Sequence, residues 1–289
     1  MDNDYLIITA SDSKYGDFLI NDWFASLKDN VNLTNTDILI LDYGLTKEQI
    51  RKIKKIKLDK SKIIIKQCKR DGHVNIIRLR DALSFLKKRK YKQVLFIDGG
   101  DIIFCDDFSK VWTTYPDYFR GVYEDSNESF SILFTSNAFD KITVKKIRNC
   151  LKNKKIINIG VLFAPYNKAV KVFKEAYALI KDKTKFGPDQ IAINYILQRD
   201  KIFKEIEKRY NFVIASSKSK FKIIDNMFYL EDGKKIAIVH NAGNLSFLRP
   251  IKNFGYKKDV KVKRFTIFCL KLFFFFSDNI KRIIENLKK

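Results

Sequence analysis

Short apolar runs alternate along the chain with longer segments in which apolar residues recur at helical spacing. The runs predict strands and the spaced segments predict helices, because side chains alternate in a strand and recur roughly every 3.6 residues in a helix. We expect strands at residues 5–9, 37–42, 62–66, 93–97, 119–123, 157–163 and 236–240. Helices are expected at residues 15–27, 75–88, 168–181 and 188–198, and a further basic helix follows Thr46, which forms a capping-box pattern with Gln49.

This order of elements predicts an α/β fold with a mixed, mainly parallel sheet flanked by helices. The run at residues 93–97 is apolar almost throughout, which is typical of a central strand buried on both faces. No internal repeat is visible, and no linker rich in Pro, Gly or Ser interrupts the chain before about residue 250. We therefore expect one large domain at residues 1–250 and a basic, aromatic tail at residues 251–289.

The composition suits a globular protein with a full apolar core. The chain has 289 residues, 46% of them hydrophobic, and its four cysteines are far apart and form no Cys-x-x-Cys pair. This spacing gives no sign of a zinc knuckle or redox motif, so reduced thiols in the cytoplasm are the simple interpretation. The acidic start at residues 1–4 is unlike an export signal, and the aromatic stretch at residues 265–276 is too short for a spanning helix.

The chain also carries a large excess of positive charge. Lys and Arg number 57 against 33 Asp and Glu, which gives a formal net charge of +24. Such a charge implies anionic partners, which include nucleotide phosphates, anionic lipid and nucleic acid. The basic residues concentrate at residues 47–70 and 252–289, although the first cluster can equally reflect a lysine-rich composition.

Two acidic residues follow the apolar run at residues 93–97. Asp98 and Asp101 are separated by Gly99 and Gly100. In open α/β sheets ligands collect at the carboxyl ends of strands, and carboxylates are preferred ligands of Mg²⁺ and Mn²⁺. The pattern therefore indicates a divalent-ion site that would hold a diphosphate. A plain polar turn remains the alternative, because Asp and Gly are common turn residues.

An acidic pair after a strand resembles the DxD signature of GT-A glycosyltransferases, whose fold is Rossmann-like. Its form here, with two intervening residues, is similar to that of the glucosyltransferase domain of procollagen lysyl hydroxylases. Residues 9–15, Thr-Ala-Ser-Asp-Ser-Lys-Tyr, are similar to the nucleotide-binding opening of glycogenin-like and lipopolysaccharide galactosyltransferases. Further similar segments follow in family order, namely Asn158-Ile-Gly160, Pro188-Asp-Gln190 and His240-Asn-Ala-Gly243.

The resemblance implies a GT-A catalytic domain at residues 1–250 that moves a hexose from a UDP-sugar, with retention of anomeric configuration, to a cell-envelope glycan or glycolipid. It implies that Mn²⁺ or Mg²⁺ is held by Asp98, Asp101 and His240. In the family the residues that match Asp12 and Tyr15 meet the uracil, the tyrosine by stacking. Further residues expected to contact the donor are Thr9, Ala10, Arg78, Gly99, Gly160 and Gly243, and those expected to be catalytic are Asn158, Asp189 and Gln190.

Elementary chemistry agrees with this ligand set. Two carboxylates and one imidazole offer an ion two oxygens and one nitrogen, which leaves positions for two phosphate oxygens. The ion would offset the charge that develops on the leaving diphosphate. Arg78 or Arg80, from the preceding helix, would add a fixed positive charge to the same phosphates. Only one of the two can easily face the site, and we favour Arg78.

Each assignment has a purely structural alternative. His240 can be a hydrogen-bonded histidine at a strand end, and Asp189 can complement the dipole of a helix N-terminus. Tyr15 can belong to the core, and Asn158 and Gly160 can simply end a strand.

The chain also departs from the family pattern. Two residues rather than one separate the aspartates, and Ile159 is bulkier than the small residue usual in the Asn-x-Gly segment. Glu124 and Asp125 follow an expected strand and could serve near the acceptor, whereas His73 is expected in a surface loop.

The tail mixes Lys and Arg with Phe, Ile and Leu from residue 254 onward, a composition suited to a membrane interface. We expect peripheral attachment to the anionic inner face of the cell membrane, and packing of the tail on the domain is the alternative. Two other function classes stay open. A nucleotidyltransferase would carry a Gly-rich loop, which residues 11–15 lack, and a nucleic-acid-binding protein would leave the proposed metal ligands without purpose.

Overall fold

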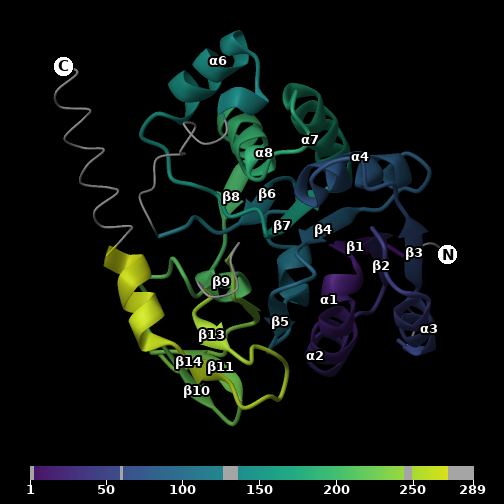
Figure 1. Cartoon of the computed structure of the whole chain (residues 1–289), viewed down its shortest axis with the longest axis vertical. Coiled ribbons are helices and arrows are strands. Elements are labelled where there is room, and N and C mark those ends of the chain that lie inside the picture. Colours follow the sequence, from purple (N-terminus) through teal and green to yellow (C-terminus); the bar gives the residue numbers. More distant parts are fainter. Residues whose placement is uncertain (1–2, 59–60, 126–135, 244–248, 273–289) are drawn as a thin grey trace.

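The computed structural model describes residues 3–58, 61–125, 136–243 and 249–272 of the chain. Figure 1 shows a central sheet between two groups of helices, with a smaller part rich in strands beside it. Residues 273–289 of the predicted tail lie outside the described residues. Within the part that is described, no helix combines the length and the apolar character that crossing a bilayer requires.

The central sheet has seven strands. They lie in the order β3 (Ile63–Gln67), β2 (Thr36–Asp42), β1 (Tyr5–Ser11), β4 (Gln93–Ile97), β7 (Val161–Pro165), β6 (Phe119–Gly121) and β8 (Phe203–Glu205). The first four are parallel, β7 is antiparallel to β4 and β6, and β6 is parallel to β8. The predicted α/β class with a mixed, mainly parallel sheet is confirmed.

Helices cover both faces of this sheet (Figure 1). One face carries α4 (Val74–Leu86), α6 (Lys141–Leu151), α7 (Tyr166–Leu179) and α8 (Pro188–Arg199). On the other face lie α3 (Lys47–Lys55) and one continuous helical segment, made of α1 (Ser13–Phe18), the π-helical η1 (Leu19–Phe24) and α2 (Ala25–Asn30). The inner strands β2, β4 and β7 are therefore shielded from water on both sides, whereas the edge strands β3 and β8 are partly exposed.

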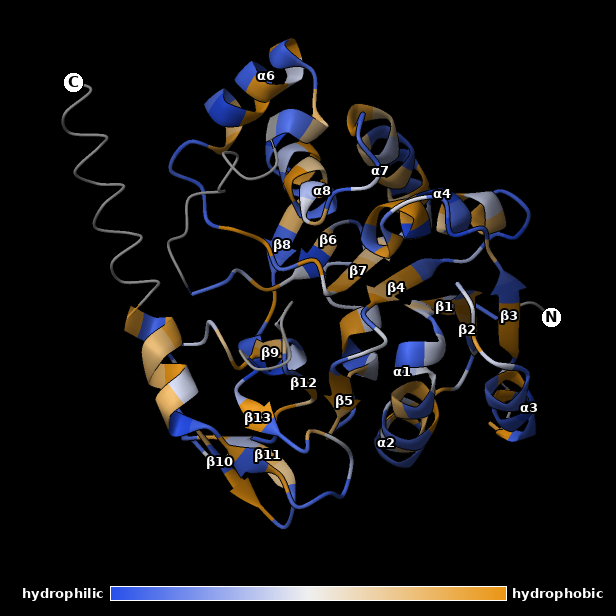
Figure 2. Cartoon of the chain, viewed as in Figure 1, coloured by the Kyte–Doolittle hydropathy of each residue, from blue (hydrophilic) through white to orange (hydrophobic). Residues whose placement is uncertain are grey.

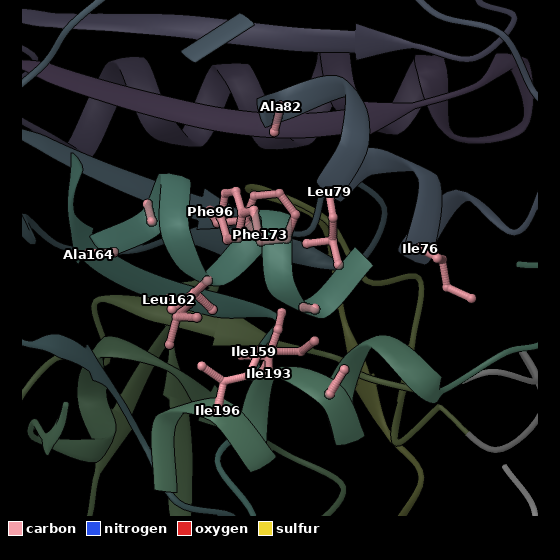
Figure 3. Close-up of a cluster of buried hydrophobic side chains, with 14 of the residues drawn as sticks. Ile76, Leu79, Ala82, Phe96, Ile159, Leu162, Ala164, Phe173, Ile193 and Ile196 are labelled. Atoms are coloured by element: carbon pink, nitrogen blue, oxygen red, sulfur yellow. The ribbon is translucent and has the colours of Figure 1, made fainter. Parts of the chain in front are cut away.

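Burial on both faces explains why the central strands show no polar alternation. In β4, Phe96 belongs to the apolar cluster under α4 and α7, whereas Leu95 belongs to the cluster on the opposite face. Figure 3 shows part of the first cluster, in which the ring of Phe96 lies 4.9 Å from that of Phe173, centroid to centroid. The orange of β4 and β7 in Figure 2 reflects the same apolar composition. Such strands are typical of sheets packed between helices.

A second, smaller group of strands flanks the central sheet. It contains a three-stranded sheet, a hairpin and a short pair, formed by β5 (Ile102–Phe104), β12 (Ile238–His240), β9 (Phe212–Val213), β10 (Phe221–Ile224), β11 (Met227–Leu230), β13 (Ile251–Lys252) and β14 (Lys261–Val262). Three 3₁₀ turns complete the described elements: η2 (Ser109–Trp112) follows β5, η3 (Ser136–Ala138) precedes α6, and η4 (Lys208–Tyr210) precedes β9.

The first residues of the predicted tail belong to this second group of strands. Ile251 is buried in it, and the ring of Phe254 stacks on that of Phe18, with 5.9 Å between the ring centroids. The first residues after position 250 therefore pack against the domain, and the division at that position stays a prediction.

The predicted elements occur with ends shifted by a few residues, except for one strand. Residues 157–163 do not form a single strand, because the Asn158 side chain accepts a hydrogen bond from the Gly160 amide and turns the chain. Ile157 forms only an isolated bridge with Tyr123, and β7 begins at Val161. Helix α6, strand β8 and the strands of the second group other than β12, which corresponds to the strand expected at residues 236–240, were not predicted.

Local signals set two helix starts near the sheet edge. Thr46 and Gln49 form the predicted capping box of α3. Before α8, Gly187 has φ 99°, a conformation that glycine adopts easily, and Pro188 occupies the first turn. The turn at Gly187 thus places Asp189 and Gln190 at the very start of a helix that faces the sheet edge.

Candidate active site

A cavity of about 960 Å³ opens at the edge of the central sheet where β1 and β4 end. All predicted site residues except Thr9 and Ala10 contribute to its wall. These are Asp12, Tyr15, Arg78, Asp98, Gly99, Asp101, Asn158, Gly160, Asp189, Gln190, His240 and Gly243. Segments far apart in the sequence therefore meet around one space that is large enough for a nucleotide sugar.

The turn between the two aspartates can be built only with small residues. A Cβ atom at Gly99 would lie 2.6 Å from Thr9 Oγ1 and 2.8 Å from the Ala10 carbonyl oxygen. At Gly100 it would lie 2.8 Å from the Tyr15 ring. The chain can therefore pass tightly against the end of β1, which brings both carboxylates to the same side of the cavity. Thr9 and Ala10 lie directly against this turn.

Strand pairing brings His240 to the aspartates from a distant part of the chain. Asp101 is followed directly by β5, which pairs antiparallel with β12 so that His240 lies opposite Ile102. The Asn241 amide also donates to the Asp101 carbonyl oxygen at 2.9 Å. The register of this pair therefore fixes the imidazole beside the second carboxylate.

Asp98, Asp101 and His240 form a cluster that fits a divalent cation. His240 Nε2 lies 3.6 Å from Asp101 Oδ1 and 3.9 Å from Asp98 Oδ2, and one ligand atom from each residue falls within 4.8 Å of the others. Adjacent ligands of an octahedral ion are roughly 3 Å apart, so side-chain movements of less than about 1 Å would complete the geometry. Gly160 leaves the necessary room, because a Cβ atom there would lie 2.4 Å from His240 Cε1.

Burial and the neighbouring positive groups shift the pKa of Asp101 in opposite directions. Burial raises the pKa of Asp101 above its ordinary value, and nearby His240 opposes that shift while Asp98 adds to it. Arg249 also approaches Asp101, with Nη2 3.3 Å from Oδ2. A bound cation would stabilise the charged form of this cluster, since an opposite charge favours an ionised carboxylate.

Arg78 rather than Arg80 faces the cavity, as the sequence favoured. Its guanidinium pairs with Asp98, lies 3.7 Å from Asp189 Oδ2 and stacks over the ring of Phe96 at 4.6 Å. Burial lowers the pKa of Arg78, but Asp98 and Asp189 outweigh that effect and raise it. Arg80 instead pairs with Asp71 and Asp81 on the outside of α4. Arg78 therefore supplies a permanent positive charge beside the cluster of Asp98, Asp101 and His240.

The first turn of α8 places another buried carboxylate, that of Asp189, in the cavity wall. Burial raises the pKa of Asp189 to about 6, while Arg78 opposes the shift. Nearby, burial also raises the pKa of Glu124, whose carboxylate accepts a hydrogen bond from Asn158 Nδ2 at 2.8 Å. Asn158 and Gln190 both oppose that increase by hydrogen bonding to Glu124. Glu124 thus lies inside the site, as its position after an expected strand had suggested.

The opposite end of the cavity contains the predicted nucleotide-binding residues. Asp12 caps α1 by accepting from the amides of Lys14 and Tyr15, and its second oxygen pairs with Arg70 Nη1 at 2.9 Å. The Tyr15 ring lies against Gly100, and the Arg249 guanidinium is 5.9 Å from its centroid. The ring and these cations offer contacts suited to a base and its phosphates.

Sequence reasoning missed several residues of the cavity wall and one residue behind it. Arg70 and Arg249 line the wall, and each belongs to a basic or coil-like stretch in which no pattern distinguishes it. Asn211 hydrogen-bonds to both Asn158 and His240, but it lies outside every matched segment.

His73 corrects one prediction, because it is not a surface loop residue. Its Nδ1 accepts from the Asn75 amide and caps α4, and its ring lies 5.4 Å from that of Phe186 in the cavity wall. Burial lowers the pKa of His73. The sequence signal was present, since a polar residue directly before an amphipathic segment often caps the helix.

Comparison with known proteins identifies the fold. The chain matches no protein-family model and no curated protein sequence. Among solved structures it is similar to the galactosyltransferase LgtC in complex with donor and acceptor sugar analogs, with a TM-score of 0.56, 16% identity and coverage of 86% of this chain and 90% of that one. An active-site mutant of LgtC gives a TM-score of 0.56 and 16% identity over 82% of this chain and 87% of that one.

The bifunctional glycosyltransferase WbbM is also similar, with a TM-score of 0.58 and 14% identity. This match covers 84% of the present chain and 46% of WbbM. The protein therefore has the GT-A fold of these glycosyltransferases, as the sequence motifs predicted.

Proposed function

We propose that the protein is a metal-dependent glycosyltransferase that moves a hexose from a UDP-sugar to a cell-envelope glycan or glycolipid, with retention of configuration. The supporting observation is the cluster of Asp98, Asp101 and His240, which lies in a nucleotide-sized cavity at the sheet edge of a GT-A fold. Retention rests on resemblance to the glycogenin-like and lipopolysaccharide galactosyltransferases.

Asp98, Asp101 and His240 would hold Mn²⁺ or Mg²⁺, which acts as a Lewis acid on the leaving diphosphate. Two arginines flank this cluster and suit the same phosphates. Arg78 is buried and fixed by two carboxylates, whereas Arg249 pairs with Asp101 and is partly exposed to the cavity. Arginine donates in a planar fork that matches phosphate oxygens, so Arg249 can exchange its present partner for a phosphate.

The remaining predicted roles follow the shape of the cavity. Tyr15 and Asp12 would contact the uracil, and Thr9, Ala10 and Gly99 support that end through the backbone. Polar groups suited to the hydroxyls of the donor sugar come from four further residues of the cavity wall, Asn158, Gly160, Asp189 and Gln190. Gly243 would contact the donor through its backbone, beside Arg249.

We also propose that the protein attaches peripherally to the anionic cytoplasmic face of the membrane. The helix at residues 264–272 exposes 78% of Phe265 and 57% of Phe268, and Leu272 lies four residues further on. These positions share one side of a helix, and Arg264 and Lys271 are exposed on the same short segment. Aromatic residues together with cations favour the interface of an anionic bilayer.

The metal-dependent step of the proposal can be tested by ligand-induced stabilisation. UDP-sugars are screened against the purified protein with and without Mn²⁺. At a ligand concentration of about 100 times Kd, binding adds about 2.7 kcal/mol, which corresponds to an increase in Tm of about 4 to 5 °C for a chain of this size. We expect this increase only when metal is present.

Two variants complete the experiment. Asp101→Ala should abolish the metal-dependent increase in Tm, whereas Asp117→Ala, which removes an exposed carboxylate outside the cavity, should retain it. An unchanged increase in Asp101→Ala, or equal stabilisation without metal, would count against the proposed function. Steeply salt-dependent binding of RNA or DNA without any binding of sugar nucleotides would favour the nucleic-acid alternative.

A further inference from the structure

A chain of four polar side chains runs behind the proposed metal cluster. It begins at Glu124, continues through Asn158 and Asn211, and ends at His240. The last three are almost completely buried, with exposed fractions of 5%, 1% and 3%. Burying an amide side chain is costly unless its hydrogen bonds are made, so this arrangement requires all of its partners to be in place.

A backbone amide fixes the direction of every hydrogen bond in this chain. The Gly160 amide can only donate, and it donates to Asn158 at 3.0 Å, so the atom it meets must be Oδ1. The same Oδ1 lies 2.9 Å from Asn211, which must therefore present its Nδ2 donor to it. Asn158 Nδ2 is left to donate to the Glu124 carboxylate at 2.8 Å.

The orientation of Asn211 then determines where His240 carries its proton. With Nδ2 directed at Asn158, the carbonyl oxygen of the Asn211 side chain faces His240 Nδ1 at 3.2 Å. An oxygen cannot donate here, so Nδ1 must carry the hydrogen. In a neutral imidazole only one nitrogen is protonated, which leaves a lone pair on Nε2.

That lone pair faces two carboxylate oxygens. Nε2 lies 3.6 Å from Asp101 Oδ1 and 3.9 Å from Asp98 Oδ2. Three acceptor atoms that face one another repel unless a positive charge lies between them. If the proton were on Nε2 instead, the ring could donate to a carboxylate and would be unable to ligate a cation.

We propose that Asn211 is a positioning residue, held by the Gly160–Asn158 contact, that keeps the proton of His240 on Nδ1 and presents Nε2 to the divalent cation. The inference rests on the metal site of the proposed function. Outer partners of this kind orient a ligating imidazole in many metal sites, and their loss typically lowers metal affinity by about 10- to 100-fold. Strand pairing supports the role, since β9 follows Asn211 directly and aligns Val213 with His240.

The tautomer can be observed directly, because the chain contains only two histidines. Long-range ¹H–¹⁵N spectra of protein labelled in its histidine rings, recorded without metal and above the titration of the rings, distinguish the two tautomers. A His73→Gln variant assigns the signals. We expect His240 in the Nδ1–H form, and observation of the Nε2–H form would overturn the inference.

Substitutions at Asn211 test the consequence for the cation. In Asn211→Leu the acceptor is lost, so we expect the proton to move to Nε2, where it can bind a carboxylate, and Mn²⁺ affinity to fall about 10- to 100-fold. Asn211→Asp keeps an acceptor for Nδ1–H but loses the donor to Asn158 Oδ1, so we expect it to retain the Nδ1–H tautomer even though its contact with Asn158 is lost. Gln93→Leu, which removes buried hydrogen bonds to Pro116 and Arg120 at the start of β4, the end away from Asp98, is the control for lost stability.

The two proposals fail in different ways. If Asn211→Leu keeps the Nδ1–H form and the Mn²⁺ affinity of the wild type, the inference is wrong even though the metal site stands. If the wild-type protein shows the Nδ1–H form but binds no Mn²⁺, the proposed function is wrong. Asn211→Asp and the wild-type spectrum still decide the tautomer if Asn211→Leu does not fold.

Discussion

The substitution Gly160→Ala should damage the metal cluster without removing any ligand. The added Cβ atom would lie 2.4 Å from His240 Cε1 and 2.9 Å from Asp98 Oδ2. Carbon atoms pack best at about 3.5 to 4.0 Å, so the imidazole must move by more than about 1 Å. Overpacking of this kind costs about 1 to 3 kcal/mol of stability, and a misplacement of about 1 Å can lower a catalytic rate about 100-fold.

Calorimetric titration with Mn²⁺ and a sugar-transfer assay measure the two effects of Gly160→Ala. Gly16→Ala is a matched control, because its Cβ atom would also approach a side-chain atom to 2.4 Å, but that atom is Gln49 Cδ, which is outside the cavity. We expect the control to keep its Mn²⁺ affinity. If Gly160→Ala binds Mn²⁺ within about threefold of the wild type, the steric reasoning about this cluster is refuted.

Three further predictions concern charge and the membrane. The folded protein holds the proton of Asp189 up to a pKa of about 6, whereas the unfolded chain releases it near 3.8, so this group lowers stability as pH rises between these values. Chemical denaturation should therefore show the free energy of unfolding of Asp189→Asn gaining about 2.4 kcal/mol relative to wild type from pH 4 to pH 7, and a constant difference would contradict the shift. Arg78→Ala leaves Asp98 and Asp189 without their shared cation and should cost about 3 to 5 kcal/mol in the same assay, whereas a loss below about 1 kcal/mol would show that Arg78 is not the main partner. Replacing both Phe265 and Phe268 by Ser should release the protein from phosphatidylglycerol vesicles in a flotation assay while donor hydrolysis continues, and undiminished binding would eliminate this helix as the anchor.

The parts of the site that the sequence predicted are those encoded locally. Asp98 and Asp101 follow a strand whose apolar character marks it as central, so their place at the sheet edge follows from the pattern. Helical spacing separated Arg78 from Arg80, because two residues along a helix correspond to roughly opposite sides. Asp189 and Gln190 were predictable for the same reason, since Pro188 marks a helix start.

The parts that were not predictable depend on pairing between distant segments. Nothing in the sequence near His240 specifies that β12 pairs with β5 or that β9 brings Asn211 alongside. The strand expected at residues 157–163 failed because the Asn158 side chain competes for a backbone amide, an interaction that apolar periodicity does not register.

The central claim is that Asp98, Asp101 and His240 together hold a divalent cation in the presence of a nucleotide diphosphate. Anomalous diffraction from crystals grown with Mn²⁺ and UDP tests it most directly. We predict a single strong peak about 2.0 to 2.2 Å from a carboxylate oxygen of each aspartate and from His240 Nε2. UDP bound in the cavity with no anomalous peak between these three side chains would contradict the account.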